Sequence, residues 1–505
     1  MIQRLKNSVG YLIGLTVIGQ LISFVRESVF AYYYGTSYQA DAYVMASQIP
    51  ITLFAVVTTS INTVILPIYT TKKEKGGQKE ADKFLNSFIV VFELVCLIFS
   101  VISYIFARQI VFIFAPAFSG EQLSLTIGYV RVLFPTIMLS AIINILTVRF
   151  NVYKNFAFPQ YVGMFQNIAI IGMMFIFARS ISTDAAVAGT ILGILINAIF
   201  LIIPCRSVFK EKIEIVAFWK DIRHVLFKVI PVACGVGIAE INRIIDKAIA
   251  SGLDTGSITG LNYANKLSVV FSALVVTSLS TVCFQKFSVL YAKREYLERF
   301  RELGRYFQVL VYILFPVTCG TLIFKKELIT VAFARGAFGA ESVNITSDIF
   351  FYYSIGILPI AVREILSKYY YSSGDTKTPM INSAIGVVIN IVLNFILSKF
   401  MGASGLALAT TISYCVVCVL LFVSIIKGQK EYKIADIIKG CLPAVAASII
   451  MSIFVCLVIN ISGINYELFR LLVGLSVGAV VYFVICYIIA RNQLKNVLAI
   501  LFGKV

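Results

Sequence analysis

The amino-acid sequence predicts an all-α, polytopic membrane protein with about fourteen transmembrane helices. Of its 505 residues, 59% are hydrophobic and only 13% are charged, whereas soluble globular chains are about 45–50% apolar and about 25% charged. Long apolar runs recur along the whole chain, and roughly 20 apolar residues are needed to cross the hydrocarbon core of a bilayer. These observations exclude a soluble enzyme and a nucleic-acid-binding module, although the formal net charge is +18.

The predicted spans follow one another along nearly the whole chain. The first comes after the basic residues Arg4 and Lys6, and no small-residue cleavage site follows it, so we expect a retained transmembrane helix rather than a cleaved signal peptide. Several prolines lie within or near spans, which membrane helices tolerate because neighbouring groups satisfy the freed backbone atoms. The spans are predicted at residues 9–34, 40–69, 84–107, 124–150, 158–178, 185–205, 228–250, 257–285, 306–324, 345–370, 379–398, 404–426, 437–461 and 467–490.

The distribution of lysine and arginine supports this number of spans. Cytoplasmic loops of membrane proteins carry an excess of both residue types. If the N-terminus is cytoplasmic and the spans alternate, the inner segments hold 30 of the 43 cations and the outer segments hold 6. We therefore expect fourteen spans with both termini in the cytoplasm, and we interpret most of the positive charge as a topological signal that also meets anionic lipid.

The sequence also contains an internal repeat. The segment APAFSGE at residues 115–121 is echoed 220 residues later by RGAFGAE at residues 335–341. The same spacing relates two further landmarks, Pro159 to Pro379 and Thr190 to Thr410. The match is weak residue by residue, but its constant spacing indicates a duplicated structural unit.

The repeat predicts a domain organisation of two pseudo-symmetric six-helix bundles. We expect one half in residues 1–220, a second in residues 221–430, and two additional transmembrane helices in residues 431–505. Because six spans is an even number, both halves insert in the same orientation, and such parallel repeats are typical of transporters that work by alternating access. The alternative is a repeat that serves structure alone, without transport.

Seven charged residues fall at predicted membrane depth, where a charge is costly and usually faces a cavity or a partner. They are Arg26, Glu27, Asp41, Glu240, Arg243, Asp246 and Lys266. Adjacent residues do not face each other on a helix, so we expect Arg26 and Glu27 to have separate partners. A cation in a central cavity suits an anionic cargo such as a phosphate or pyrophosphate, and Arg26 is the first candidate.

Two of these assignments have alternatives. Glu240 and Arg243 are three residues apart, so they can satisfy each other as an ion pair on one helix face. Lys266 can instead extend its amine to the membrane surface.

Neutral oxygen donors form a second group of candidate ligands. Asn390 and Asn394 are four residues apart in an apolar run, so both amides lie on one helix face. Thr410 lies on the next span, and Asp246 is an acidic residue of the seventh span. One carboxylate with amide, hydroxyl and backbone oxygens can bind a hard monovalent cation. Interhelical hydrogen bonding that only holds helices together is the alternative.

Two stretches of the sequence carry a family resemblance. Residues 19–50 contain GQLISFVRESVFA, then YGTS, ADAY and QIP, and residues 256–267 read GSITGLNYANKL. The first resembles the N-terminal signature of the MurJ (MviN) family, with its R-[DE], G-x-S and D-A-[FY] motifs. The second is similar to the family's G-S-x-x-x-L-x-Y-A-x-[RK]-L motif. The family lies in the multidrug/oligosaccharidyl-lipid/polysaccharide flippase superfamily, and the resemblance covers essentially the whole chain.

The resemblance implies a flippase that moves lipid II, the undecaprenyl-pyrophosphate-linked peptidoglycan precursor, to the outer leaflet of a bacterial plasma membrane. The family's first-helix arginine falls on Arg26, its second-helix aspartate on Asp41 and its eighth-helix arginine on Lys266. Two other family arginines fall on Gln20 and Phe54, so both cations are missing here. With neighbouring candidates, the expected substrate-binding set is Arg26, Glu27, Asp41, Arg243, Asn265 and Lys266.

The resemblance also implies an ion and a set of partners. Some family members look sodium-coupled, and the matching positions for a sodium site are Asp246, Asn390, Asn394 and Thr410. No other cofactor is expected. The expected partners are the lipid-linked substrate and membrane lipids, without nucleic acid, and one chain is expected to form a complete transport unit. The last two spans are expected to form a groove for the lipid tail.

Other functions are left as alternatives by the sequence. One is a flippase for another lipid-linked oligosaccharide, of the capsule, exopolysaccharide or teichoic type. A second is a cation-coupled drug exporter, although such relatives typically have twelve spans. A membrane enzyme is not expected, because the longest outer segment, around residues 109–123, holds only one acid, Glu121, and no nucleophile elbow, metal motif or phosphate loop is present.

Overall fold

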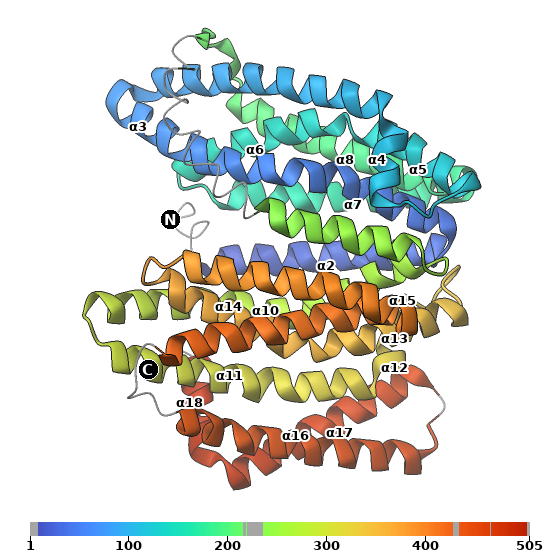
Figure 1. The fold of residues 1–505 in the computed structure, drawn as a ribbon, viewed down its shortest axis with the longest axis vertical. Coiled ribbons are helices and arrows are strands. Elements are labelled where there is room, and N and C mark those ends of the chain that lie inside the picture. Colours follow the sequence, from blue (N-terminus) through green and yellow to red (C-terminus); the bar gives the residue numbers. More distant parts are fainter. Residues whose placement is uncertain (1–8, 216–218, 220–235, 428–433, 465, 502–505) are drawn as a thin grey trace. The chain divides into compact units, whose positions relative to one another are not determined.

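The computed structural model describes residues 9–215, 219, 236–427, 434–464 and 466–501. Over these residues the chain folds into helices without any β-strand (Figure 1). Seven helices coincide with single predicted spans, or with the described part of one: α2 (Val9–Tyr34), α7 (Ala157–Ile181), α8 (Asp184–Ile202), α10 (Ser257–Ala292), α11 (Tyr296–Ile323), α16 (Ile434–Ser462) and α17 (Glu467–Ile489).

Two very long helices each hold two predicted spans. Helix α3 (Tyr38–Ile105) covers the second and third spans, and its backbone turns back at Gly77, where φ is 76°. Helix α15 (Lys377–Lys427) covers the eleventh and twelfth spans and breaks at Gly402, where φ is 55°. Positive φ is readily adopted only by glycine, so each of these residues divides its long element into two helices.

Two other predicted spans are each made of a pair of helices. Helices α5 (Gly120–Leu133) and α6 (Thr136–Val152) meet at a bend of 43°. Helices α13 (Ala340–Ile355) and α14 (Ile357–Tyr371) form the tenth predicted span. The remaining elements are short: α4 (Ala107–Phe114), η1 (Ile203–Cys205), η2 (Val208–Lys210), α12 (Lys325–Phe333) and α18 (Arg491–Leu501).

Membrane-crossing length and composition support the predicted class of the protein. Within the described part of the chain, nine helical segments are long and apolar enough to cross a bilayer, or ten with the bent α5–α6 pair. The seventh predicted span, residues 228–250, lies partly outside the described residues, and its described part, 236–250, is helical. The polytopic all-α fold is therefore confirmed, whereas the number fourteen stays a prediction.

Helix starts repeat with the spacing found in the sequence. Helices α5 and α13 start at residues 120 and 340, and α7 and α15 start at residues 157 and 377, so both pairs are 220 residues apart. The short helices α4 and α12 occupy corresponding places before them. The two stretches of chain therefore follow the same order of helices.

Contacts divide the chain into two compact units. Unit 1 comprises Met1–Thr259 with Gly336–Phe338, and unit 2 comprises Gly260–Arg335 with Gly339–Val505. The unit boundaries come from packing, whereas the halves 1–220 and 221–430 come from the repeat and stay a prediction. The core of unit 1 joins α3, α6 and α8, and the core of unit 2 joins α10, α11, α14, α15, α16 and α17.

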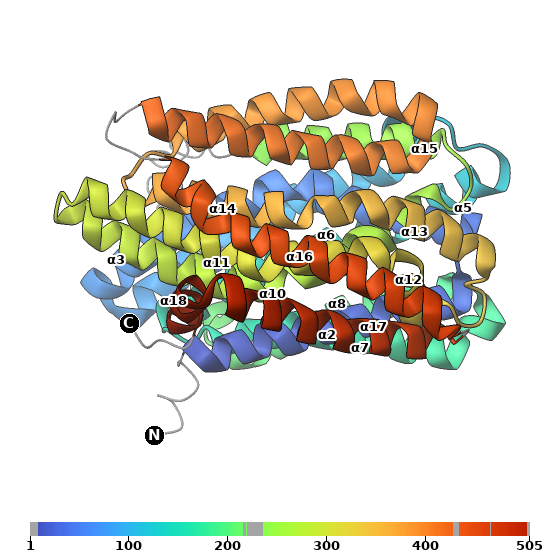
Figure 2. The ribbon, with the colours of Figure 1, turned by 90° about the horizontal axis from the view of Figure 1, so that it is seen from below.

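Apolar side chains also cover much of the outside of these helices. Phe175 and Ile176 on α7 are 63% and 69% exposed, and Ile488 on α17 is 74% exposed. In unit 2, α16 and α17 pack side by side (Figures 1 and 2) and carry such residues along their lengths. Contiguous exposed apolar surface of this extent is typical of contact with lipid.

The pairing of α7 with α8 depends on two glycines. Gly189 and Gly193 are four residues apart on α8, and both face the backbone of α7. A Cβ atom at Gly193 would lie 2.8 Å from the Gln166 Cα atom. Small residues at this spacing allow two membrane helices to approach closely. The resulting van der Waals contacts stabilise the pair, because the hydrophobic effect does not drive helices together within lipid.

Gly193→Ala is expected to destabilise the protein, because its methyl group must push α7 away. Overpacking of this kind costs about 1–3 kcal/mol. Gly172→Ala on α7 is the matched control, because nothing lies within 4 Å of its Cβ position, and alanine is about 1 kcal/mol better than glycine in a helix. Thermal unfolding of the purified protein in detergent measures both. Equal midpoints for the two variants would contradict this packing.

Candidate functional site

Arg26 and Glu27 lie near the middle of α2 and form an ion pair with each other. An Arg26 Nη2 hydrogen donates to Glu27 Oε1. The side chain of Glu27 is 6% exposed, whereas that of Arg26 is 26% exposed. The two side chains therefore do meet, contrary to the expectation from helix geometry, because the long arginine side chain bends across the angle between neighbouring helical positions. The pair keeps a guanidinium partly accessible at membrane depth with its counter-ion beside it.

Aromatic packing holds this part of α2 against its neighbours. The ring of Phe30, one turn after Arg26, lies 4.9 Å from the ring of Tyr34 and 5.0 Å from that of Tyr43 on α3. Tyr43 Oη is 2.9 Å from Thr190 Oγ1 on α8, and both groups are buried. These contacts set the position of α2, and with it the position of the ion pair.

Asp41 occupies the first turn of α3 and accepts hydrogen bonds from the start of α10. Its Oδ2 atom accepts from the Gly256 backbone N–H at 2.7 Å, and its Oδ1 atom accepts from the Thr259 N–H at 2.8 Å. The Thr259 hydroxyl also donates to Oδ1. Asp41 is 2% exposed. A carboxylate at a helix N-terminus satisfies otherwise unpaired N–H groups and is favoured by the helix dipole.

Both copies of the repeated motif dock in unit 1. Ala337, in the second copy, donates its N–H to the carbonyl of Tyr32 at 2.8 Å, and it lies directly against Gly35. Ala117, in the first copy, donates its N–H to Ser251 Oγ at 3.5 Å. Residues 336–338 of the second copy therefore belong to unit 1, where α2 ends and α3 begins.

The predicted ion pair of the seventh span is present. Arg243 Nη1 lies 2.9 Å from Glu240 Oε1. The side chain of Glu240 is 9% exposed and that of Arg243 is 59% exposed, so the cation reaches toward the surface of unit 1 while the carboxylate is enclosed. Asp246, one turn further on, accepts a hydrogen bond from Asn242 Nδ2 at 3.3 Å.

The remaining predicted ligands lie in unit 2. Asn265 is exposed and Lys266 is half-buried on α10. On α15, Asn394 Nδ2 donates to Asn390 Oδ1 at 3.1 Å, and Asn390 Nδ2 lies 3.4 Å from Thr410 Oγ1. Asn390 and Asn394 are 3% and 0% exposed. The three polar groups form one hydrogen-bonded string across the break at Gly402.

The predicted site residues are therefore distributed over both units. Unit 1 holds one set and unit 2 the other, and direct contacts join Arg26 with Glu27 in unit 1 and Asn390 with Asn394 and Thr410 in unit 2. Their roles toward a substrate or a sodium ion stay predictions. The unit 1 set is Arg26, Glu27, Asp41, Arg243 and Asp246, and the unit 2 set is Asn265, Lys266, Asn390, Asn394 and Thr410.

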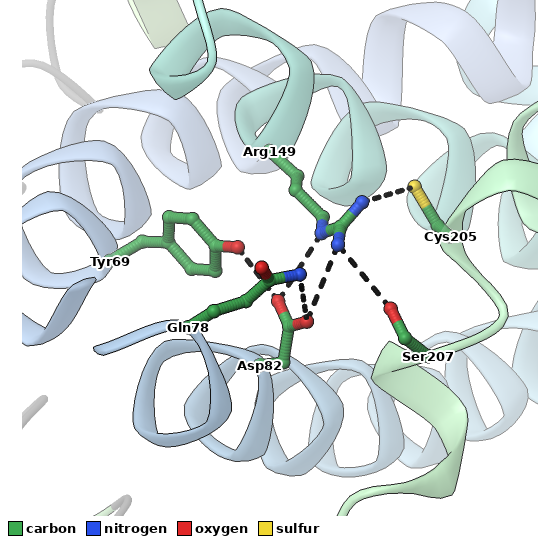
Figure 3. Close-up of polar contacts among 6 residues, drawn as sticks. All are labelled: Tyr69, Gln78, Asp82, Arg149, Cys205 and Ser207. Atoms are coloured by element: carbon green, nitrogen blue, oxygen red, sulfur yellow. Dashed lines mark hydrogen bonds and ion pairs between the residues drawn. The ribbon is translucent and has the colours of Figure 1, made fainter. Parts of the chain in front are cut away.

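One buried polar cluster was missed by the sequence reasoning. Arg149, at the end of α6, was counted only as a topological cation, yet it forms an ion pair with Asp82 on α3 (Figure 3). Four further side chains complete the cluster: Tyr69, Gln78, Cys205 and Ser207. Asp82 directly precedes an apolar run, and that position gave no signal of a partner 67 residues away.

Glu93 was also missed, although the sequence does signal it. It is the single acid in the apolar run 88–102 on α3. Its Oε1 atom is buried without a hydrogen-bond partner among the described residues. A lone carboxyl group in such a run meets the same criterion as the seven charges that were singled out.

Unit 2 contains an apolar pocket of about 430 Å³ between the C-terminal helices and the rest of the unit. Helices α11, α12, α16, α17 and α18 contribute its walls, among them Pro316, Phe324, Val455 and Val497. Gly474 on α17 lies against the Phe324 ring, so closely that a Cβ atom would be 2.0 Å from Cζ. The surface that lines the pocket is almost entirely apolar.

Comparison with known proteins identifies the family of this bundle. The family model described as "Lipid II flippase MurJ" matches residues 30–477. The chain belongs to the MurJ lipid II flippase family. Among its relatives, the "Probable lipid II flippase MurJ" of Rickettsia prowazekii is 23% identical over 451 residues, which cover 88% of each chain. The "Lipid II flippase MurJ" of Burkholderia cenocepacia is 25% identical over 434 residues, or 82% of each chain.

Solved structures agree with this family. A structure titled "Lipid II flippase MurJ, inward closed conformation" superposes with a TM-score of 0.83 at 26% identity, covering 96% of this chain and 99% of that one. An inward-facing multidrug transporter of the MATE family superposes with a TM-score of 0.68 at 11% identity, covering 83% of this chain and 96% of that one. The second likeness shows a shared fold only.

One departure of this MurJ-family chain from the expected pattern has a structural counterpart. Phe54, which takes the place of a family arginine, lies with its ring 6.0 Å from the ring of Phe92, and Phe92 stacks on Phe88 at 5.5 Å. The position is therefore part of an aromatic row between the two legs of α3.

Asp41→Asn in this MurJ-family chain is expected to loosen the start of α10. The amide keeps one acceptor, but its NH₂ group faces N–H donors, and a buried donor without a partner costs about 1–3 kcal/mol. Hydrogen exchange at Gly256 and Thr259 should accelerate, and the unfolding midpoint should fall. Asp348→Asn is the control, because that carboxylate is 61% exposed and pairs only with Lys325 among the described residues. Unchanged exchange in Asp41→Asn would contradict the cap.

Proposed function

We propose that this chain translocates lipid II, or a closely related undecaprenyl-pyrophosphate-linked glycan, from the inner to the outer leaflet of a bacterial plasma membrane by alternating access. The observation that carries the proposal is the family match over residues 30–477, together with the Arg26–Glu27 pair at membrane depth. A multi-pass bundle of the MurJ family is a transporter rather than a catalyst. We further propose that both termini are cytoplasmic and that one chain is a complete transport unit.

The pyrophosphate group would be bound by exchange of ion pairs. Arg26 is paired with Glu27, and its guanidinium carries five N–H donors. An incoming pyrophosphate supplies several charged acceptors in a geometry that guanidinium binds well. Lys266, Arg243 and Asn265 are the further candidates for this contact. Asp41 would act by holding α10 in place rather than by touching the cargo in this conformation.

The lipid tail would stay in an apolar environment throughout. The pocket bounded by Phe324, Val455, Gly474 and Val497 matches an undecaprenyl segment in character, and burial of each CH₂ group contributes about 0.8 kcal/mol. This supports the expected role of the last two spans. Only the charged pyrophosphate-linked head group would then need to pass among polar side chains.

We further propose that transport is coupled to sodium, which the second group of candidate ligands would bind. Asn390, Asn394 and Thr410 already form a string of oxygen-bearing side chains, and Asp246 would supply the carboxylate. Hard cations such as sodium prefer oxygen ligands of this type. Binding of the ion would bias the chain toward one conformation only if the four residues come together better in that conformation.

Arg26→Ala is expected to abolish growth of cells that have been depleted of their own lipid II flippase and depend on this chain. The substitution removes the cation and leaves the Glu27 carboxylate buried without its partner. Protein levels in the membrane should hold, as measured by immunoblot. Arg179→Ala is the matched control, because Arg179 is exposed in the last turn of α7, and it should support growth. Growth of Arg26→Ala cells like the parent would remove Arg26 from the proposal.

Asp246→Asn is expected to abolish the response of transport to sodium, because a neutral amide cannot balance the charge of the ion. Transport of labelled lipid II in vesicles with sodium or choline as the external cation measures this response. Asp254→Asn, an exposed acid of the following loop, is the control. If transport by Asp246→Asn keeps the same sodium dependence as the parent, the proposed site is wrong.

A further inference from the structure

The segment that follows α8 is built into unit 1. Residues 203–214 lead from α8 toward the seventh predicted span, so they begin the connection between the two predicted halves. The segment forms two short 3₁₀ turns, η1 and η2, and the side chains of Cys205 and Val208 are fully buried. A free surface tether would expose such residues, so this stretch has a fixed docking place.

Arg149 is the centre of this docking place. Its Nε atom donates to Asp82 Oδ1 at 3.2 Å, and its Nη2 atom lies 3.4 Å from Asp82 Oδ2 (Figure 3). The same guanidinium reaches the connecting segment, with Nη2 3.3 Å from Ser207 Oγ and Nη1 3.6 Å from Cys205 Sγ. One arginine thus joins α6, α3 and the connecting segment.

Asp82 is held by more than Arg149. Tyr69 Oη donates to its Oδ1 atom at 2.7 Å, and Gln78 Nε2 lies 3.4 Å from Oδ2. Asp82 is 2% exposed and the Arg149 side chain is 12% exposed. A buried ion pair is tolerated when its remaining hydrogen-bonding groups are satisfied, and it then favours one geometry over others more than it adds stability. The cluster therefore specifies where the segment lies.

Three further contacts fasten the distal end of the segment. Asn86 Nδ2 donates to the Glu211 carbonyl at 2.7 Å, and the Glu214 N–H donates to Ser87 Oγ at 2.9 Å. Lys83 Nζ lies 3.5 Å from Glu214 Oε1. The α3 groups in these contacts all lie on the turn that follows Asp82. The distal end of the segment is therefore tied directly to α3, and the proximal end is tied to α3 through Arg149.

Unit 2 also has a buried arginine that joins two helices, but its contacts differ from those of Arg149. Arg299, near the start of α11, donates to the Tyr369 carbonyl and, at 2.9 Å, to Ser372 Oγ. It therefore closes the end of α14 on its own unit. Of these two buried arginines, Arg149 is the one whose described contacts include a segment that leads toward the other half.

We propose that Arg149 and Asp82 are positioning residues that keep residues 205–214 docked on unit 1 throughout the transport cycle. The inference rests on the proposed function, because it concerns movement during transport. Residues 205–214 then move together with unit 1. The part of the connection that can change its position relative to unit 1 begins after Glu214, rather than at the end of α8. Neither residue touches the cargo; both act through the segment they hold.

Limited proteolysis tests the docking itself. Lys210 and Lys212 are exposed trypsin sites within the segment, and Lys293 and Arg294, exposed in the loop between α10 and α11, are the internal reference. Loss of the anchor should speed cleavage at Lys210 and Lys212 by about tenfold or more, because cleavage needs local opening. We expect this in Arg149→Ala and Asp82→Asn full-length protein, with Arg149→Lys intermediate. Unchanged relative cleavage in both variants would overturn the role of the pair.

A milder variant separates positioning from stability. Asn86→Ala with Ser87→Ala removes two anchors of the segment and leaves the Asp82–Arg149 pair in place. We expect faster cleavage at Lys212 and slower lipid II transport, with an unfolding midpoint close to that of the parent. Faster cleavage with full transport would show that docking is not needed for transport and would overturn the proposal.

A reversible crosslink tests whether the segment stays docked during the cycle. Lys83→Cys with Glu214→Cys is made in a background that transports lipid II and keeps, of the native cysteines, only the fully buried Cys205. The two new thiols are joined by a short bis-methanethiosulfonate, which forms a reducible disulfide with each thiol and releases sulfinate. We expect the crosslinked protein to transport at a rate close to that of the same protein after reduction. Loss of transport that reduction restores would overturn the proposal. If the reduced protein and the parent both fail to move lipid II, the proposed function fails, while the proteolysis result still reports on docking.

Discussion

The constraint on which the rest of the structure depends is the lack of water in the hydrocarbon core of the membrane. Every charge or backbone polar group carried to that depth needs a partner within the protein. Glu27 pairs with Arg26, and Asp41 accepts three hydrogen bonds from the start of α10. Just before the predicted span 84–107, the buried Asp82 is likewise surrounded by Tyr69, Gln78 and Arg149. Each of these arrangements also fixes the position of a helix or a loop. The contacts that pair a buried charge are therefore also contacts that hold the fold together.

The sequence predicts the helices well, because the length and polarity of a membrane span are local properties. Helices α2, α7 and α17, for example, lie where the sequence predicts spans at 9–34, 158–178 and 467–490. Polar partnerships are different. Asp41 and Thr259 are 218 residues apart and Asp82 and Arg149 are 67 apart, so only the folded chain brings them together. The Arg26–Glu27 pair was mispredicted from Cβ directions, which ignore side-chain length, whereas Glu93 was visible in the sequence and was overlooked.

The buried charges of this chain fall into two kinds. Asp41 and Asp82 are almost fully enclosed and use both carboxylate oxygens, so they hold elements in place. Arg26 and Arg243 are ion-paired but keep 26% and 59% of their side chains exposed, with their acidic partners buried beside them. Guanidinium groups of this second kind are accessible to an anionic ligand, whereas loss of the cation would cost about 3–5 kcal/mol because the buried carboxylate would lose its counter-ion. A flippase needs both kinds, because it must hold its helices in place and also bind and release a charged head group.

The most direct test of this account is lipid II translocation by the purified chain in sealed vesicles. Fluorescent lipid II is placed in one leaflet, and its arrival in the other is followed with a probe that does not cross the membrane. The account predicts transfer that depends on the parent chain, is lost with Arg26→Ala and returns in part with Arg26→Lys, which keeps the charge but not the bidentate geometry. Transfer by Arg26→Ala at the parent rate, or no transfer by the parent chain, would contradict it.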